Sequence, residues 1–84
     1  MHTVELMDRA IRVAEELGYV VRHEWLGGSG GGGCEFGGRK YLFVDLALTS
    51  VEQFDQVVQT IRDDPASHLL NAPDELSTYL RRAA

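Results

Sequence analysis

Residues 34–48 read CEFGGRKYLFVDLAL, and this stretch decides the fold. Its two adjacent glycines, Gly37 and Gly38, suit the two positive-φ positions of a tight hairpin turn. We therefore predict a hairpin in which a short strand, Cys34–Phe36, precedes a long strand, Arg39–Leu48.

That turn fixes which residues face one another. Glu35 falls opposite Lys40, which predicts a cross-strand ion pair, and Cys34 falls opposite Tyr41. Alternate residues of the long strand then lie on opposite faces of the sheet. The face predicted to be the core carries Lys40, Leu42, Val44, Leu46 and Leu48, and the second face carries Tyr41, Phe43, Asp45 and Ala47.

Two further elements are indicated upstream of the hairpin. Apolar residues recur every three or four positions from Val4 to Leu17, which predicts an amphipathic helix that ends at Gly18. The period then changes to two over Tyr19–Leu26, as a half-buried strand requires. The glycine loop, residues 27–33, joins this strand to the hairpin.

Helices follow the hairpin. Thr49 with Glu52, and Ser50 with Gln53, each match the reciprocal capping box that opens a helix. The apolar stripe of this helix consists of Val51, Phe54, Val57, Val58 and Ile61. This helix is predicted to end at Asp63-Asp64-Pro65. A short helix over 66–70 is predicted to follow, with Asp64 as its cap.

A last helix is expected from Pro73 to about Arg82, with Leu76, Tyr79 and Leu80 pointing inward. The predicted fold class is thus α+β: a helix, a three-stranded antiparallel sheet and then two to three helices (αβββαα), packed on one face of the sheet.

With 84 residues, of which 44% are hydrophobic, the chain suits a single domain over residues 1–84. The core of so small a domain is thin, so self-association would help to stabilise it.

The charge balance limits the classes of partner that the chain is expected to bind. Thirteen acidic residues against eight basic ones give a net charge of −5, which lacks the basic footprint that phosphate backbones demand. Nucleic acid and membrane surfaces are therefore not expected as partners. A single cysteine, Cys34, suits a reducing compartment, and no apolar run approaches the ~20 residues of a membrane span. Met1–Leu6 lacks the pattern of a signal peptide, so we expect a cytoplasmic protein.

The glycine loop offers many unshielded backbone N–H groups, and such groups can cradle an anion. It joins strand to strand, however, and its spacing fits neither a P-loop nor a dinucleotide fingerprint. The favoured interpretation is a flexible connection. The alternative is a site for an anion or a nucleotide, formed by Gly28, Ser29, Gly30, Gly31, Gly32 and Gly33.

Cys34 and the histidines are the remaining candidates for chemistry. A nucleophilic Cys34 would need a base, and the only plausible one, His23, is predicted on the opposite sheet face. His2, His23 and His68 lack the spacing of metal ligands, so neither a metal nor a cofactor is expected.

The second face of the predicted sheet is unusually aromatic. Such a face favours an interaction surface, because a face meant only for water carries fewer apolar side chains. The candidate residues are Leu26, Cys34, Phe36, Tyr41 and Phe43.

Leu17–Arg22, Gly38–Asp45 and the later Glu52-Gln53 resemble the front half of the ImmA/IrrE-like metallopeptidase scaffold. By pattern the resemblance covers roughly residues 4–63, and it implies a helix, three strands and a second helix in that order. In that family the second helix carries H-E-x-x-H, whereas here it reads VVQTIRD over 57–63. The resemblance therefore implies a relative without peptidase activity.

The run from Trp25 to Phe36, with Leu42–Leu48 after it, is also similar to small uncharacterised bacterial proteins. Altogether we predict a non-catalytic protein–protein interaction module, expected to form a homodimer through the aromatic face. Two alternatives remain: an anion- or nucleotide-binding protein that uses the glycine loop, and a cysteine-dependent enzyme. In the latter, Cys34 would lie beside N–H donors from 31–33 that form an oxyanion hole.

Overall fold

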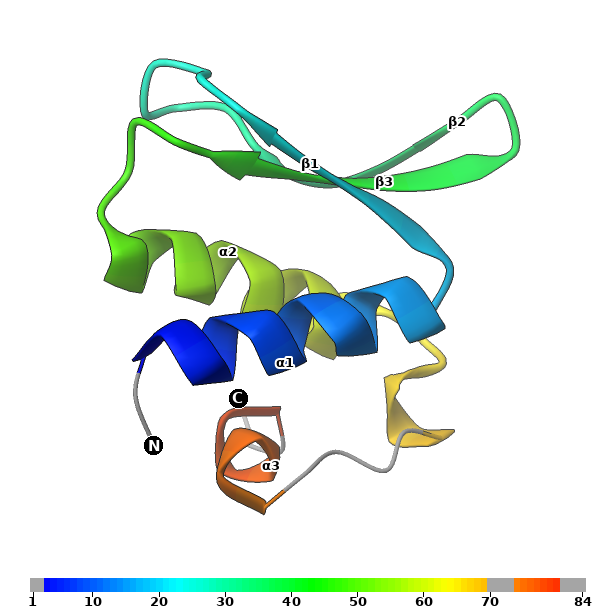
Figure 1. Ribbon diagram of the computed structural model, residues 1–84. Coiled ribbons are helices and arrows are strands. Elements are labelled where there is room, and N and C mark those ends of the chain that lie inside the picture. Colours follow the sequence, from blue (N-terminus) through cyan, green and yellow to red (C-terminus); the bar gives the residue numbers. More distant parts are fainter. Residues whose placement is uncertain (1–2, 70–73, 81–84) are drawn as a thin grey trace.

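The computed structural model describes residues 3–69 and 74–80. The elements are α1 (Thr3–Glu16), β1 (Tyr19–Glu24), β2 (Gly32–Phe36), β3 (Arg39–Asp45), α2 (Ser50–Asp63), the 3-10 turn η1 (Ser67–Leu69) and α3 (Asp74–Leu80). This is the predicted α+β order of a helix, three strands and then helices. In Figure 1, α1 and α2 lie against one face of the sheet, and α3 packs on their far side. No helix of the described residues covers the other face.

The sheet is mixed, so the prediction of an antiparallel sheet is wrong. Its strand order is β1-β3-β2, in which β1 pairs parallel with β3 and β2 pairs antiparallel with β3. The strand with the most apolar inner face, β3, takes the centre, where Leu42 and Val44 are fully buried. Apolar residues stabilise a sheet most in a strand with neighbours on both sides, because these neighbours shield them from water.

The hairpin has the predicted register. Gly37 and Gly38 have φ values of 62° and 77°, and Cys34 pairs with Tyr41 across the β2–β3 ladder. Glu35 also lies opposite Lys40, but the predicted ion pair between them is wrong. Lys40 turns toward the helices instead.

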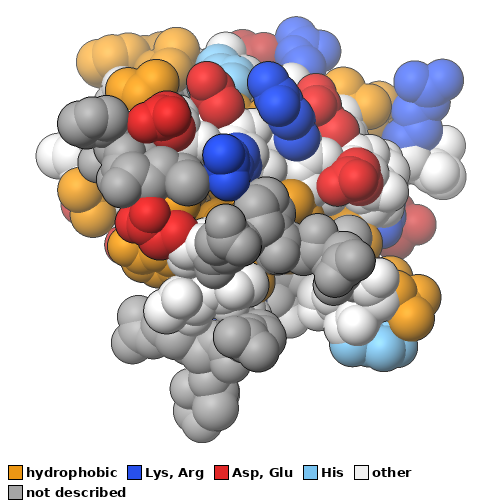
Figure 2. Space-filling view, turned by 60° about the horizontal axis from the view of Figure 1, so that its bottom comes forward, with side chains coloured by type: hydrophobic (Ala, Val, Ile, Leu, Met, Phe, Trp, Pro, Cys, Tyr) orange, Lys and Arg blue, Asp and Glu red, His pale blue; other side chains and the backbone are white. Residues whose placement is uncertain are grey.

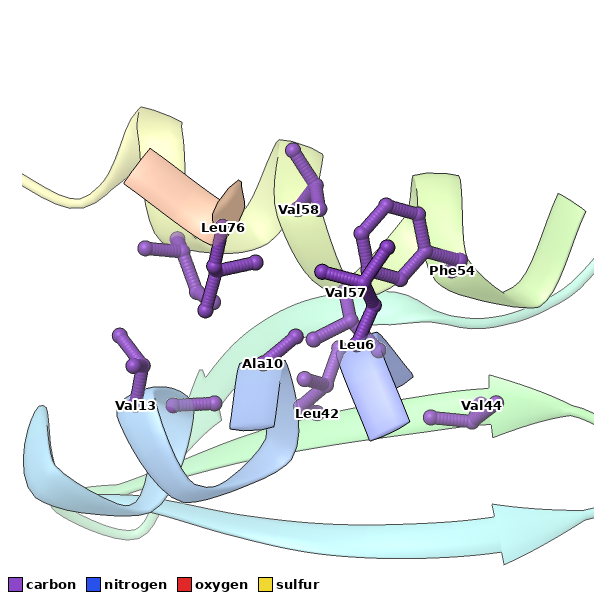
Figure 3. Packing of buried hydrophobic residues seen from close by; sticks show 11 residues of the cluster. Leu6, Ala10, Val13, Leu42, Val44, Phe54, Val57, Val58 and Leu76 are labelled. Carbon is purple, nitrogen blue, oxygen red and sulfur yellow. The ribbon is translucent and has the colours of Figure 1, made fainter. Parts of the chain in front are cut away.

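The core lies between the sheet and the helix layer (Figure 3). The predicted stripe of α2 is confirmed except for Val51, which lies in the first turn and is 63% exposed. Tyr79 keeps its ring edge against Phe54, at 5.1 Å between centroids, but is more exposed than predicted. The buried apolar residues are Leu6, Ala10, Val13, Ala14, Leu42, Val44, Phe54, Val57, Val58, Ile61 and Leu76.

The ends of two elements differ from the prediction. β3 stops at Asp45, because the Asp45 carboxylate and carbonyl accept N–H groups of the following turn. Leu46 is consequently exposed, and Leu48 is only half-buried. The short helix expected over 66–70 is the 3-10 turn η1, and residues 70, 73, 81 and 82 of the predicted elements lie outside the described residues.

The start of α2 follows the predicted capping chemistry. The Thr49 side chain accepts the backbone N–H of Glu52 at 3.2 Å, and the Glu52 carboxylate accepts the N–H of Thr49 at 2.9 Å. This reciprocal pair selects Thr49 over Ser50 as the cap. It also fixes where the chain turns back from the sheet to form the helix layer.

Candidate functional site

Four apolar side chains predicted to form an interaction surface lie together on the uncovered face of the sheet. The Tyr41 ring contacts Phe36 edge-on at 5.6 Å and stacks on Phe43 at 6.0 Å. Val20 lies beside Tyr41 on β1, and Cys34 lies beside it on β2. We call these five residues, Val20, Cys34, Phe36, Tyr41 and Phe43, the exposed-face patch.

The patch is open to solvent, as Phe36 is 69% exposed. Its rim is charged: on β1, next to Phe43 in register, Arg22 forms an ion pair with Glu24 at 2.9 Å. Leu26, the fifth predicted residue, is not part of the patch. It follows the end of β1 and packs where a Cβ of Gly30 would lie.

The glycine-rich segment carries the chain from one edge of the sheet to the other. After β1 it passes the end of β3 and enters β2 on the far side; we call residues 25–31 the glycine crossover. Gly32 and Gly33, predicted as loop, already belong to β2. Positive φ values at Gly27, Gly28 and Gly31 show why glycine is needed along this path.

Asp45 holds the glycine crossover in place. Its carboxylate accepts the backbone N–H groups of Leu26 at 3.0 Å, Gly28 at 2.7 Å and Ala47 at 2.9 Å. Strand alternation places Asp45 on the second face of β3 with Tyr41 and Phe43, but Asp45 is 0% exposed, because the glycine crossover closes over the end of the strand. Sequence reasoning missed this role, although an acid that directly follows an apolar strand was a signal for it.

The surroundings keep Asp45 ionised. Burial by itself raises the pKa of Asp45, but the backbone N–H groups that it accepts outweigh burial, and the pKa lies below the usual 3.8. Two donors of the glycine crossover, Leu26 and Gly28, thus already bind an anion that belongs to the chain, and Gly28 is also a residue of the predicted anion site. An external anion would compete with Asp45 for them, and the anion-binding alternative stays a prediction.

Gln56 of α2 ties the glycine crossover to the helix layer. Its side-chain oxygen accepts the N–H of Asp45 at 3.0 Å, and its Nε2 donates to the carbonyl of Gly30 at 3.0 Å. A Cβ at Gly31 would lie 2.5 Å from that nitrogen, so only glycine fits. The spacing of the sequence gave no indication of this contact.

An open groove of about 1060 Å³ runs beneath β2, between this strand and α2. At one end Lys40 Nζ lies 2.8 Å from Oδ2 of Asp64, and the Tyr19 hydroxyl donates to the same oxygen at 2.9 Å. The Lys40 ammonium also lies 4.6 Å from the centre of the Tyr19 ring. At that end of the groove, Tyr19, Lys40 and Asp64 therefore bind one another and stabilise the fold.

The pKa values of this cluster follow from its contacts. The hydrogen bond from Lys40 lowers the pKa of Asp64 below its usual value, against the opposing effect of burial. Burial raises the pKa of Tyr19 from 10.0 to about 12, and the hydrogen bond to Asp64 adds to this increase. At neutral pH Asp64 is therefore a carboxylate and Tyr19 a neutral phenol.

The structure separates Cys34 from its only predicted base. Cys34 is exposed on β2, whereas His23 lies on β1 at the other edge, in register with the core-facing Val44. The two side chains point to opposite faces of the sheet. The enzyme alternative therefore lacks its predicted base, His23, beside its nucleophile.

Residues 3–69 and 74–80 contain no cluster of metal ligands and no membrane-spanning helix. No three His, Cys, Asp or Glu side chains gather there as a metal would require, and His2 lies outside this part of the chain. None of the helices in this part combines the length and the apolar character needed to cross a membrane.

Comparison with known protein families, with curated proteins and with solved structures finds no match to this chain. The resemblances seen in the sequence thus stay predictions.

Proposed function

We propose that this chain is a protein–protein interaction module that acts by binding and not by catalysis. Its binding surface is the exposed-face patch, and one of its partners is a second copy of the chain. The single observation that carries the proposal is the uncovered sheet face, where the half-buried ring of Tyr41 contacts both the exposed ring of Phe36 and the half-buried ring of Phe43. We place this activity in a reducing cytoplasm, which is the compartment that suits an exposed free thiol such as Cys34.

The two sides of the molecule differ in the way an interaction surface requires. Over part of the helix side, acidic and basic side chains lie next to each other, with single hydrophobic side chains around them (Figure 2). On the sheet side, the charges of Arg22 and Glu24 neutralise each other at the rim, and the centre is apolar. Aromatic centres inside a polar rim are typical of protein interfaces, since burial of a ring contributes far more than a rim charge does.

A contiguous apolar patch in water is costly, and a partner removes that cost. Burial of apolar surface contributes roughly 25 cal/mol for each Å². Phe36, at the edge of the patch, is the most exposed of its rings. It therefore has the most to gain when another molecule covers it.

The test is the solution mass, measured by light scattering over a concentration series. We expect the wild type to dimerise and Tyr41→Glu to associate at least about tenfold more weakly, because the new carboxylate would lie between Phe36 and Phe43. Val51→Glu is the matched control, since it adds the same charge to an exposed apolar position of α2. Circular dichroism checks that both variants are folded.

Two outcomes would contradict the proposal of self-association. One is a wild type that stays monomeric up to millimolar concentration. The other is a folded Tyr41→Glu variant that dimerises as tightly as Val51→Glu, because the patch would then play no part in association.

A further inference from the structure

The outer edge of β2 is open to another strand. β2 is an edge strand, and no described residue hydrogen-bonds to its outer side. A two-residue turn makes Phe36 and Arg39 a hydrogen-bonded pair, so Glu35 and Gly33 occupy non-hydrogen-bonded positions of the ladder. Their backbone N–H and C=O groups therefore point outward, away from β3.

The other edge of the sheet is less suited to pairing. β1 carries two charged residues, Arg22 and Glu24, and charged side chains on an edge strand discourage addition of another strand. β2 has a single charged residue, Glu35, and two glycines. Of the two edges, β2 is the one that can extend the sheet.

We propose that two copies of the chain pair antiparallel along their β2 strands, with the two-fold axis at Cys34. β2 spans Gly32–Phe36, so Cys34 is its central residue, and an axis there overlaps the whole strand. It also sets Gly33 of each copy opposite Glu35 of the other. These are the residues with outward backbone groups, and the pairing gives four backbone hydrogen bonds.

The two neighbouring registers that keep this hydrogen-bond pattern are less favourable. An axis at Glu35 sets the two Glu35 carboxylates directly opposite each other, which is destabilising. An axis at Gly33 sets Glu35 opposite Gly31, which lies outside β2, and leaves Phe36 unpaired. Charge and overlap therefore both select Cys34.

This arrangement rests on the proposed function, because its partner is the second copy; it sets the two exposed-face patches side by side and brings the Phe36 part of each patch against the other copy. Antiparallel strands related by a two-fold axis present the same face of the sheet, so both patches lie on one side of a six-stranded sheet. Phe36 of each copy then falls beside Gly32 of the other, which has no side chain. The ring covers this gap next to Phe43, which is the register partner of Gly32.

The central thiols make the register measurable. Opposed residues at a non-hydrogen-bonded antiparallel position have Cα atoms about 4.5 Å apart, within the span of a disulfide. Copper phenanthroline in air can therefore oxidise the two exposed Cys34 thiols to a disulfide. The thiols release two protons, and oxygen accepts the two electrons through the copper. We expect a covalent dimer to form over the concentrations at which light scattering detects the non-covalent one.

The control is Cys34→Ser combined with Leu69→Cys, which moves the single thiol to an exposed site on η1. We expect at least about tenfold slower cross-linking of this variant at equal concentration. A second pair of variants tests the backbone: Glu35→Pro removes the outward N–H and should give monomers, while Glu35→Ala keeps that N–H and should dimerise. The β2–β3 ladder does not use the N–H of Glu35, so Glu35→Pro keeps the ladder intact.

The outcomes separate this inference from the proposed function. A wild type that dimerises without faster cross-linking of Cys34 overturns pairing along β2 but leaves self-association through the patch in place. A wild type that is monomeric at every concentration overturns both. If Glu35→Pro does not fold, the comparison of the two thiol positions decides by itself.

Discussion

The ammonium of Lys40 lies 2.8 Å from Oδ2 of Asp64, although Glu35 is its neighbour across the β-ladder. The Asp64 side chain is only 5% exposed, so without that cation its carboxylate would be a buried charge with no opposite charge beside it. Glu35 on the outer strand is hydrated and needs no partner. The only lysine of the chain therefore pairs with the buried carboxylate of Asp64 and not with the exposed carboxylate of Glu35.

Matched amide substitutions should expose this preference. We expect Asp64→Asn to lower the free energy of unfolding by about 2 kcal/mol, because it removes a partly buried ion pair. Glu35→Gln should change it by less than about 0.5 kcal/mol, as surface substitutions do. Urea titration of dilute protein measures both, and an equal loss for the two variants would show that Lys40 is shared between them.

The pH dependence of stability should have an acid limb. The pKa values of Asp45 and Asp64 are both lowered from 3.8 in the fold, so the folded state binds protons less readily than the unfolded chain. Their contribution to stability is complete above the unfolded value and is lost as pH falls below 3.8 through the folded values. Urea midpoints between pH 2 and pH 6 measure this, and a flat profile below pH 4 would be inconsistent with it.

An alkaline limb should come from Tyr19. Its pKa is raised from 10.0 to about 12, so the fold favours the neutral phenol. This contribution is complete below pH 10 and is lost as pH rises from 10 to about 12. Tyr19→Phe should cost about 1 kcal/mol at neutral pH and weaken the alkaline loss. Tyrosinate absorbance compared between wild type and Tyr19→Phe gives the pKa directly, and ionisation of Tyr19 near 10 would contradict the prediction.

Asp45→Asn should loosen the glycine crossover. The amide nitrogen of Asn would face backbone N–H donors, which leaves buried donors without acceptors. We expect the melting temperature to fall by more than about 10 °C and the amides of Leu26 and Gly28 to lose protection from hydrogen exchange. Asp55→Asn, an exposed carboxylate of α2, is the control that should leave both unchanged.

A double-mutant cycle can test the close packing of β2 on α2. A Cβ at Gly33 would lie 2.7 Å from Cγ2 of Thr60, so Gly33→Ala should cost about 2 kcal/mol by overpacking. Thr60→Ser removes that methyl group but keeps the hydroxyl, which donates to the Gln56 carbonyl. Combined with Gly33→Ala, it should recover most of the loss.

The control for this cycle is Gly28→Ala. Gly28 has φ +91° and open space around its Cβ position, so its cost is backbone strain alone. Thr60→Ser should leave that cost unchanged. Recovery of Gly28→Ala by the same substitution would mean that Thr60→Ser stabilises the chain by itself and that the contact is not the cause.

Local patterns predicted the local structure. The turn at Gly37 and Gly38, the register that follows from it and the capping box at Thr49 all depend on residues within a few positions of one another. Strand alternation likewise placed Tyr41 and Phe43 on the uncovered face, and Leu26 left that face only because β1 ends before it.

Contacts between distant residues decided the remainder. The order of strands depends on Asp45 and Gln56, which hold the glycine crossover from two different elements. Neither residue belongs to a spacing that reveals its partner, so the sequence favoured the simpler antiparallel meander. The Asp64 pair was missed for the same reason, because its cation stands on β3, 24 positions earlier.

The strand order also determines the order in which the strands can pair during folding. β1 has one neighbour in the sheet, β3, and the chain between them includes all of the glycine crossover and β2. During synthesis β1 therefore emerges from the ribosome well before its only partner exists. The β2–β3 hairpin, closed by a two-residue turn, can form in microseconds, and β1 must then find the far side of a strand that is already paired. The slow step of folding is expected to be this late docking of the earliest strand.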